Sequence, residues 1–211
     1  PDDNYRYEVI EVVSGEYQGK AYQTYIVEMV SQQWLTSAEV NLPLWVHELV
    51  ITVPEEVSSD IGFLYLTGGS NEGNRRGAAP ESDIKRALQT GTVVSTLYGV
   101  PSQPLVFADD DGRRRSEDGI IAYTWDKYLR TGDEKFPLRL PITTSPFPSL
   151  SPITYLLPPP VLPASTFVPF VLPCRSHRRS PSSPSPALHP PVLPLLPLLT
   201  PLLPLHPPFH H

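Results

Sequence analysis

Hydrophobic and polar residues alternate with a period of two in two neighbouring segments near the amino terminus. The alternation covers residues 5–13 and 21–30, where aromatic and β-branched side chains are frequent. A period of two predicts strands with one face towards solvent. The intervening residues 14–20 include Gly15 and Gly19, which suit a chain reversal. We therefore expect an antiparallel hairpin.

Three further segments have the patterns of strands. Residues 45–53 alternate up to Pro54, and residues 92–97 are rich in β-branched side chains. Residues 61–66 contain hardly a polar atom, which is typical of a strand covered on both faces. This buried strand runs directly into a tight, glycine-containing loop at residues 67–71.

Two helices are expected after that loop. The first runs from Pro80 to Gly91 and should turn an apolar stripe of Ile84, Ala87 and Leu88 towards the sheet. Alternating strands and helices imply crossover connections. We therefore expect an α/β fold with a largely parallel sheet behind the leading antiparallel hairpin.

The second helix should begin after Ser116, a favourable N-cap residue, and end at Gly132. Ile121, Trp125 and Tyr128 follow one another at the i, i+4 and i+7 spacing of a single helix face. If that face is core, removing the Trp125 ring should cost about 3–5 kcal/mol of stability.

The composition divides the chain into two parts. Of the 28 prolines, 22 lie from Pro137 onwards, whereas the last acidic residue is Glu134. Residues 1–134 have a net charge of −11 and the remainder +5. We expect a folded part at residues 1–143, followed by a Pro/Leu/Ser-rich tail at residues 144–211.

Three interpretations of the tail remain open: translation of a retained intron or a shifted reading frame, a disordered linker, or a polyproline ligand. Pairs such as Pro194 and Pro197 have the spacing that SH3-type and WW-type domains bind, which would give a weak contact. Residues 140–174 carry no charge, yet their many prolines argue against a transmembrane helix. The single Cys174 cannot form a disulfide within the chain.

The acidic first part argues against binding of nucleic acid, because that binding depends on neutralising phosphates. The basic run 113–115 is expected to be a solvated loop with internal ion pairs, and an anion contact is the alternative. Residues 109–112 resemble a calcium loop, but Phe107 occupies the first ligand position. His206, His210 and His211 lack a fixed geometry. No metal or cofactor is therefore expected.

Two tryptophans and one histidine are weaker candidates for a binding or catalytic site. Trp34 and Trp45 could line a pocket, although large aromatics are more often core anchors. His47 is the only histidine outside the tail and could act as a base. No activated partner can be named for it, so we expect a hydrogen-bonded structural role.

Five motifs resemble the amino-terminal half of the PhoPQ-activated pathogenicity-related family, which includes autocrine proliferation repressor-type proteins. The resemblance extends over residues 5–143 and rests on SQQWL (31–35), LTGGSN (66–71), QPLVF (103–107), EDGIIAYTWDKYL (117–129) and FPLRLP (136–141). It implies a partial α/β-hydrolase-like fold, and a secreted or envelope location. Partners stay unknown.

The resemblance also places a site. In hydrolases of that fold, the loop after the third central strand donates a backbone N–H to the oxyanion hole. This implies Gly69 and Ser70 as backbone donors, supported by Thr67, Gly68 and Asn71. A G-x-S-x-G nucleophile turn is absent from the sequence, so no catalytic residue is named.

Two functions follow. One is a hydrolase-type domain cut short before its nucleophile and therefore inactive as this chain. The alternative is a secreted signalling or binding module that never required catalysis.

Overall fold

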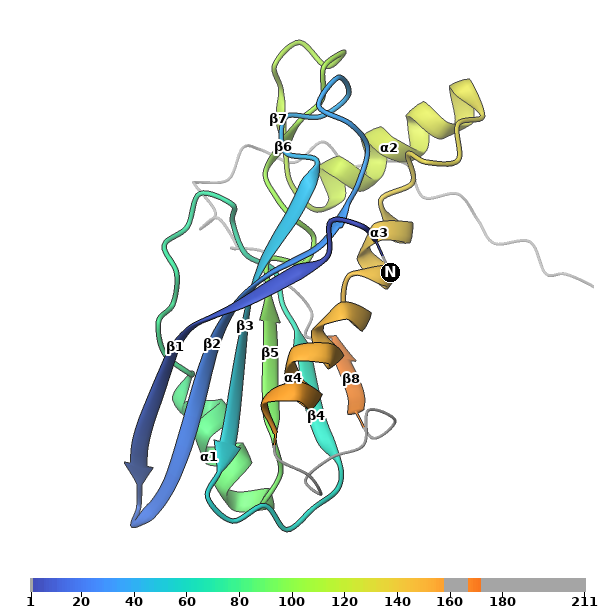
Figure 1. The fold of residues 1–211 in the computed structure, drawn as a ribbon. Helices are drawn as coiled ribbons and strands as arrows, with labels where there is room; N and C mark the ends of the chain where they lie inside the picture. The colour runs from blue at the N-terminus through green and yellow to red at the C-terminus, as the bar shows by residue number, and fades with distance from the viewer. Residues whose placement is uncertain (1, 158–166, 172–211) are drawn as a thin grey trace, which may run out of the picture. The chain divides into compact units, whose positions relative to one another are not determined.

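A six-stranded sheet in the order β1-β2-β3-β5-β4-β8 organises the part of the chain that the computed structural model describes, residues 2–157 and 167–171 (Figure 1). The strands are β1 (Arg6–Tyr17), β2 (Lys20–Gln33), β3 (Leu44–Pro54), β4 (Gly62–Leu66), β5 (Val94–Tyr98) and β8 (Phe167–Val171). The tail features at residues 174–211, including Cys174 and the terminal histidines, lie outside the described residues.

The chain has the expected mixed α/β character, but the sheet is mainly antiparallel. Three pairings, β1–β2, β2–β3 and β3–β5, are antiparallel, and two, β4–β5 and β4–β8, are parallel. The prediction of a largely parallel sheet was therefore wrong. The long strands β1, β2 and β3 form a continuous meander, and β5 returns to pair with β3 instead of extending a parallel series.

The hairpin between β1 and β2 is longer and its turn is tighter than the sequence predicted. Only Gln18 and Gly19 form the turn, and both have positive φ, at 53° and 76°. This backbone suits a two-residue hairpin loop. Gly15 lies inside β1 opposite Tyr22, where an added Cβ would come within 2.5 Å of the tyrosine ring. Gly15 therefore makes room for a cross-strand neighbour and does not turn the chain.

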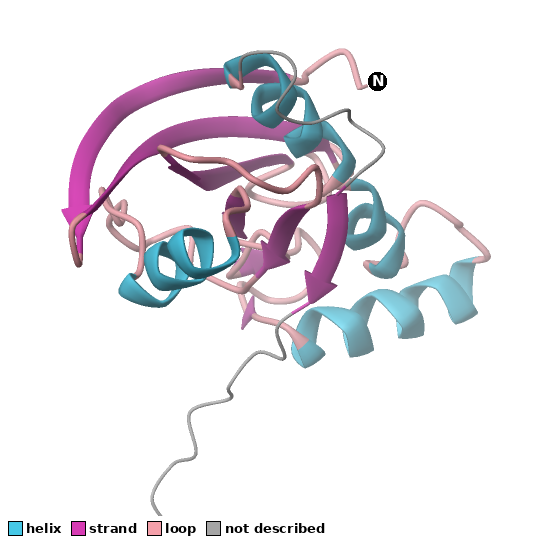
Figure 2. Cartoon of the chain, turned by 90° about the horizontal axis from the view of Figure 1, so that it is seen from below, coloured by secondary structure: helices cyan, strands magenta, loops and turns pink. Residues whose placement is uncertain are grey.

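Helix α1 (Glu81–Thr90) connects β4 to β5 and covers one face of the sheet. Ile84, Ala87 and Leu88 are buried, and Gly91 ends the helix in the left-handed conformation, as expected. The helices α3 (Arg139–Thr144) and α4 (Leu150–Leu156) and the 3₁₀ turn η1 (Phe147–Ser149) follow on the opposite side (Figures 1 and 2).

This second layer runs beyond residue 143, where the sequence placed a domain boundary. Ile153 and Leu157 are buried against the sheet, in a cluster with Met29. Pro141 and Pro152 are each the third residue of a short helix. Proline is tolerated there, because the first turn needs no N–H donor to the preceding chain.

Helix α2 (Asp118–Thr131) turns a different face to the core than the periodicity indicated. Its buried residues are Ile120 and Thr124, whereas the side chain of Trp125 is 37% exposed and packs edge-on against Tyr128. The predicted stripe, with its 3–5 kcal/mol cost for the Trp125 ring, was wrong. The Thr124 hydroxyl accepts the Leu138 N–H at 3.3 Å, so contacts from a distant segment select this face.

A second core cluster lies beneath α2. Trp34 and Trp45 are buried there with Phe107, which confirms that both tryptophans are core anchors. The short strands β6 (Leu105–Val106) and β7 (Arg114–Arg115) pair beside it. None of the helices in the described residues has the length and apolar character needed to cross a membrane.

Candidate functional site

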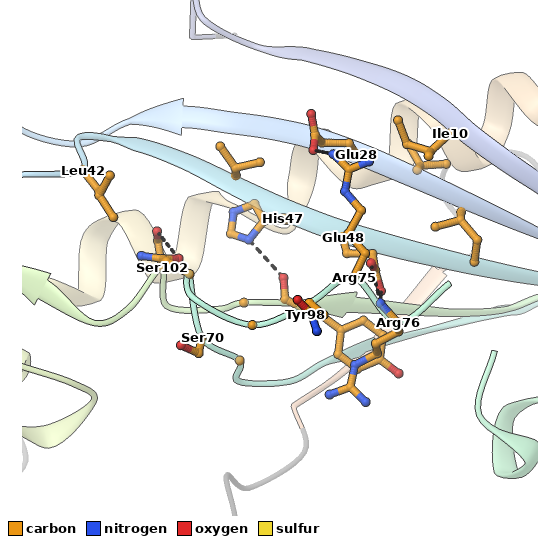
Figure 3. A pocket seen from close by; sticks show the side chains of 18 of the residues that line it. Ile10, Glu28, Leu42, His47, Glu48, Ser70, Arg75, Arg76, Tyr98 and Ser102 are labelled. Carbon is orange, nitrogen blue, oxygen red and sulfur yellow. Dashed lines mark hydrogen bonds and ion pairs between the residues drawn. The ribbon is translucent and has the colours of Figure 1, made fainter. Parts of the chain in front are cut away.

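A cavity of about 530 Å³ lies between β2 and β3 on one side and the loops that follow β4 and β5 on the other (Figure 3). The glycine loop at residues 67–71 contributes Gly69, Ser70 and Asn71 to its wall. The carboxyl end of β5 contributes Tyr98 and Gly99. The structure thus places the loop that the sequence singled out in the wall of this cavity.

The main chain of the loop has a defined orientation. The carbonyl of Gly68 accepts the Gly99 N–H at 3.5 Å, and the carbonyl of Gly69 accepts the Gln103 side-chain amide at 3.2 Å. In a trans peptide the C=O and N–H point in opposite directions. The N–H groups of Gly69 and Ser70 therefore both point away from segment 99–103. Neither donates a hydrogen bond within the described residues.

The ends of the loop are fixed by further hydrogen bonds. The Val100 N–H donates to the Thr67 carbonyl at 3.1 Å, and the Asn71 N–H donates to the Gln103 carbonyl at 2.5 Å. The Ser102 hydroxyl donates to the Asn71 side chain at 3.1 Å. Thr67 and Asn71 thus tie both ends to one neighbouring segment, which holds the two free donors in place.

Gly69 packs directly on Gly99. An added Cβ at Gly69 would lie 3.1 Å from the Gly99 nitrogen and 3.2 Å from its Cα. Gly99 itself has a φ of 80°, a conformation that favours glycine. The close approach of two main chains therefore requires glycine at both positions.

Gln103 also links the loop to the start of α2. Its side-chain carbonyl accepts the Glu117 N–H at 2.7 Å, while its amide donates to the Glu117 carboxylate at 3.2 Å. The Gln103 side chain is buried. The position of the Gly69 carbonyl thus depends on a residue that the sequence marked only as part of a family motif.

The hydroxyl of Ser70 serves the turn and has no base beside it in the described residues. Its Oγ accepts the Glu72 N–H at 3.2 Å. A catalytic serine needs a partner that removes its proton. Ser70 therefore contributes its backbone to the cavity and not a nucleophile.

His47 lies on β3, beside the end of β5, and both of its ring nitrogens are hydrogen-bonded. Nδ1 is 3.2 Å from the Tyr98 carbonyl, which can only accept, so Nδ1 carries the proton. Nε2 must then accept the Ser31 hydroxyl at 2.8 Å. Burial lowers the pKa of His47 from 6.5 to about 4.

Ser31 and His47 have the separation of a nucleophile and its base, but Ser31 is 1% exposed and is not part of the cavity wall. A substrate in the cavity would not reach its hydroxyl. The pair therefore has the hydrogen-bonded structural role expected of His47. No sequence signal pointed to Ser31, since its strand register with β3 is set by a bulge between Val30 and Gln32.

Four charged residues line the other end of the cavity. Glu28 and Glu48 lie directly opposite each other on β2 and β3. Two like charges in this position repel each other and destabilise the sheet. Arg75 forms an ion pair with Glu28, and the Arg76 N–H donates to both Glu48 oxygens at 3.2 and 3.0 Å. Arg75 therefore compensates Glu28 with its side-chain charge, and Arg76 compensates Glu48 with its main-chain N–H.

The Arg76 guanidinium lies 4.0 Å above the ring of Tyr98. Burial raises the pKa of the Tyr98 hydroxyl to about 12, so Tyr98 is neutral at physiological pH. The cation and the ring form a cation–π contact, which holds the segment around Arg76 against β5.

The remaining charged candidates form ion pairs with one another. Arg114 pairs with Glu72 at 2.6 Å and Arg115 pairs with Asp110, which confirms the expected ion pairs. The expected solvated loop was wrong in part, because Arg114 and Arg115 form strand β7 and the Arg115 and Asp110 side chains are only 17% and 13% exposed. Asp109 pairs with Lys127 at 2.5 Å. The described residues contain no group of three or more His, Cys, Asp or Glu side chains arranged to hold a metal ion.

Among solved structures, the chain is similar to a glucuronoyl esterase from Solibacter usitatus. The match has 16% identity, covers 64% of this chain and 44% of that protein, and has a TM-score of 0.30. That score does not establish a shared fold.

Sequence comparison gives a firmer relationship. The chain is 33% identical over 145 residues to Autocrine proliferation repressor protein A of Dictyostelium discoideum, an alignment that spans 68% of this chain but only 28% of that protein. The family model for PhoPQ-activated pathogenicity-related proteins matches residues 1–168. The chain therefore belongs to the PhoPQ-activated pathogenicity-related family.

Proposed function

We propose that residues 67–71 form the oxyanion-binding loop of a hydrolase-type domain, and that this chain supplies that part of a site without a nucleophile of its own. One observation carries the proposal: Gly69 and Ser70 line the cavity, and their N–H groups, which point away from segment 99–103, have no acceptor within the described residues. Both residues are exposed, so the two donors are open to a ligand.

Acyl transfer builds negative charge on the carbonyl oxygen of the substrate. Two fixed N–H donors stabilise that charge more than they stabilise the neutral carbonyl, which lowers the barrier. Loss of one such donor costs about 2.7–4 kcal/mol in hydrolases that use this device. The bonds from Gly99 and Gln103 to the loop carbonyls fix the donors beforehand, so little reorganisation is needed.

No group among the described residues is placed to attack the substrate. Its sequence has no G-x-S-x-G turn, the Ser70 hydroxyl accepts a turn hydrogen bond, and Ser31 is buried away from the cavity. We therefore expect ester hydrolysis by the 211-residue chain to stay at the uncatalysed rate. Turnover that Ser70→Ala abolishes would contradict this assignment.

Binding of an oxyanion mimic tests the loop without requiring turnover. The probe is the methyl methylphosphonate anion, which has the tetrahedral geometry of the intermediate, titrated into ¹⁵N-labelled chain and followed by NMR. We expect the largest amide shifts at Gly69 and Ser70. Ser70→Pro removes the N–H and should abolish them, whereas Ser70→Ala keeps the N–H and should not. Shifts centred on Arg75 and Arg76 instead would contradict the proposal.

The relative from Dictyostelium discoideum favours a second candidate function, a secreted signalling or binding module, because its name describes an autocrine proliferation repressor. A module of this kind needs a recognition surface and no oxyanion loop. Repression of cell proliferation by the purified chain that persists in Ser70→Pro would favour this function over the hydrolase-type one.

A further inference from the structure

We propose that the cavity beside the glycine loop binds the apolar acyl group of an uncharged ester, with the ester carbonyl at Gly69 and Ser70. This inference rests on the oxyanion-binding function and adds the class of ligand. The argument starts from the opposite wall of the cavity, which belongs to β1, β3 and the segment that precedes β3.

That wall is apolar although it is open. Ile10, Leu42 and Val46 are 40%, 42% and 44% exposed, and all three line this one cavity. Val46 lies within a strand between Trp45 and His47, which are both buried. An exposed apolar group in such a setting marks a surface that a ligand can cover.

The size of the cavity fits a small molecule. Its volume of about 530 Å³ lies within the range of about 300–1,000 Å³ typical of ligand sites. Figure 3 shows Leu42, Ser102 and Ser70 at one end and Ile10 and Glu28 at the other. A ligand with its carbonyl at the glycine loop can therefore place its acyl chain against Leu42, which lies at the same end, whereas Ile10 lies at the charged end beside Glu28 (Figure 3).

The charges of the cavity favour an uncharged ligand over a carboxylate. The formal charges of Glu28, Glu48, Arg75 and Arg76 sum to zero, with Arg75 paired to Glu28 and the Glu48 carboxylate held by the Arg76 main-chain N–H. Arg75 is engaged with Glu28, and the Arg76 guanidinium lies on the Tyr98 ring. A carboxylate would lose hydration and meet two glutamates without a cation released for it. An ester loses little hydration and still offers a carbonyl oxygen.

The test compares three probes on the full ¹⁵N-labelled chain: methyl butanoate, methyl hexanoate and sodium hexanoate. Each buried methylene contributes about a fourfold gain in affinity, so hexanoate ester should bind about 15-fold more tightly than butanoate ester. Sodium hexanoate should bind at least about tenfold more weakly than its methyl ester. Equal affinities across the ester pair, or tighter binding of the carboxylate, would overturn the inference.

Val46→Asp should weaken methyl hexanoate binding by at least about tenfold. Val12→Asp is the matched control, because Val12 is a 49% exposed valine of β1 that does not line the cavity. Leu42→Ser gives a second wall variant outside a strand, in case Val46→Asp does not fold. If Val12→Asp weakens binding as much as the wall variants do, the cavity is not the site.

The amide shifts separate the two proposals. Chain-length-dependent binding that shifts the wall residues but not Gly69 and Ser70 would retain the acyl site and remove the oxyanion function. If the phosphonate anion binds at Gly69 and Ser70 but the two esters bind equally well, the oxyanion function is retained and the acyl site is rejected. If no ester binds and the wild type is a dimer that Val46→Asp dissociates, a second copy of the chain covers the wall, and the acyl site is rejected.

Discussion

The two faces of β2 and β3 differ in how they are covered, although both are built from the same strands. On one face Met29, Leu49 and Ile51 have no exposed surface, because α4 packs over them. On the other face Val46 is 44% exposed and Glu28 lines the cavity. The first face therefore stabilises the fold. On the second face Ile26 and Val50 are buried with Tyr98, and only the part around Val46 and Glu28 remains available to a ligand.

The largest expected contrast is a pair of substitutions on β3. Leu49→Ala should lower the free energy of unfolding by about 2–5 kcal/mol, because it removes buried methyl groups and leaves a cavity. Val46→Ala should change it by no more than about 0.5 kcal/mol, since the side chain is already solvated. Denaturant unfolding measures both. Similar losses would mean that the cavity face is also covered.

His47 should make stability depend on pH. Its pKa is about 4 in the folded chain and near 6.5 when unfolded. Between these values the unfolded state binds more protons, so stability is full above pH 6.5 and falls by about 3 kcal/mol as the pH drops to 4. His47→Gln should remove that part of the slope while the carboxylates still titrate. An unchanged slope in the variant would contradict the buried, neutral ring.

Gly69→Ala probes the open side without touching the covered core. The new methyl would press on Gly99 main-chain atoms at 3.1–3.2 Å, so the loop must move. We expect a stability loss of about 1–3 kcal/mol together with at least about tenfold weaker binding of the phosphonate probe. Gly77→Ala is a contrast, because its Cβ would meet open space but its φ of 64° is unfavourable for alanine, so it should cost stability without weakening binding of the phosphonate probe. Unchanged binding in Gly69→Ala would mean that the loop is not preorganised by this contact.

The smallest effect is expected at α2. Trp125→Ala should cost about 1 kcal/mol or less, since the ring is exposed and contacts Tyr128 on the same helix. Ile120→Ala should cost about 2–5 kcal/mol, because Ile120 is the buried residue of the helix. Thermal unfolding of the two variants compares them directly. A larger loss for Trp125 would restore the helix face that periodicity first indicated.

Local patterns in the sequence predicted the local features of this fold. Alternation and runs of apolar or β-branched residues predicted the strands, proline and glycine marked the ends of α1, and the glycine pair at residues 68–69 marked a loop that lines the cavity. Sheet direction could not be read in this way, because it depends on which distant strands pair. The buried face of α2 could not be predicted locally either, because it depends on the hydrogen bond from the Leu138 N–H to the Thr124 hydroxyl.

The same reason explains what was missed at the site. Arg75 meets Glu28 across 47 positions of sequence, and Ser31 meets His47 across 16 through a bulged register. Each residue is ordinary in its own neighbourhood. The partners of each pair come together only in the folded sheet, so composition and spacing could not predict these contacts.

Strand β1 borders the sheet, and among the described residues it pairs only with β2. About every second residue of this twelve-residue strand therefore presents its main-chain N–H and C=O groups at the free edge, where recognition requires no side chain. The exposed carboxylates of Glu8, Glu11 and Glu16 repel an identical copy. Salt screens that repulsion, so concentrated solutions of high ionic strength should favour association along this border.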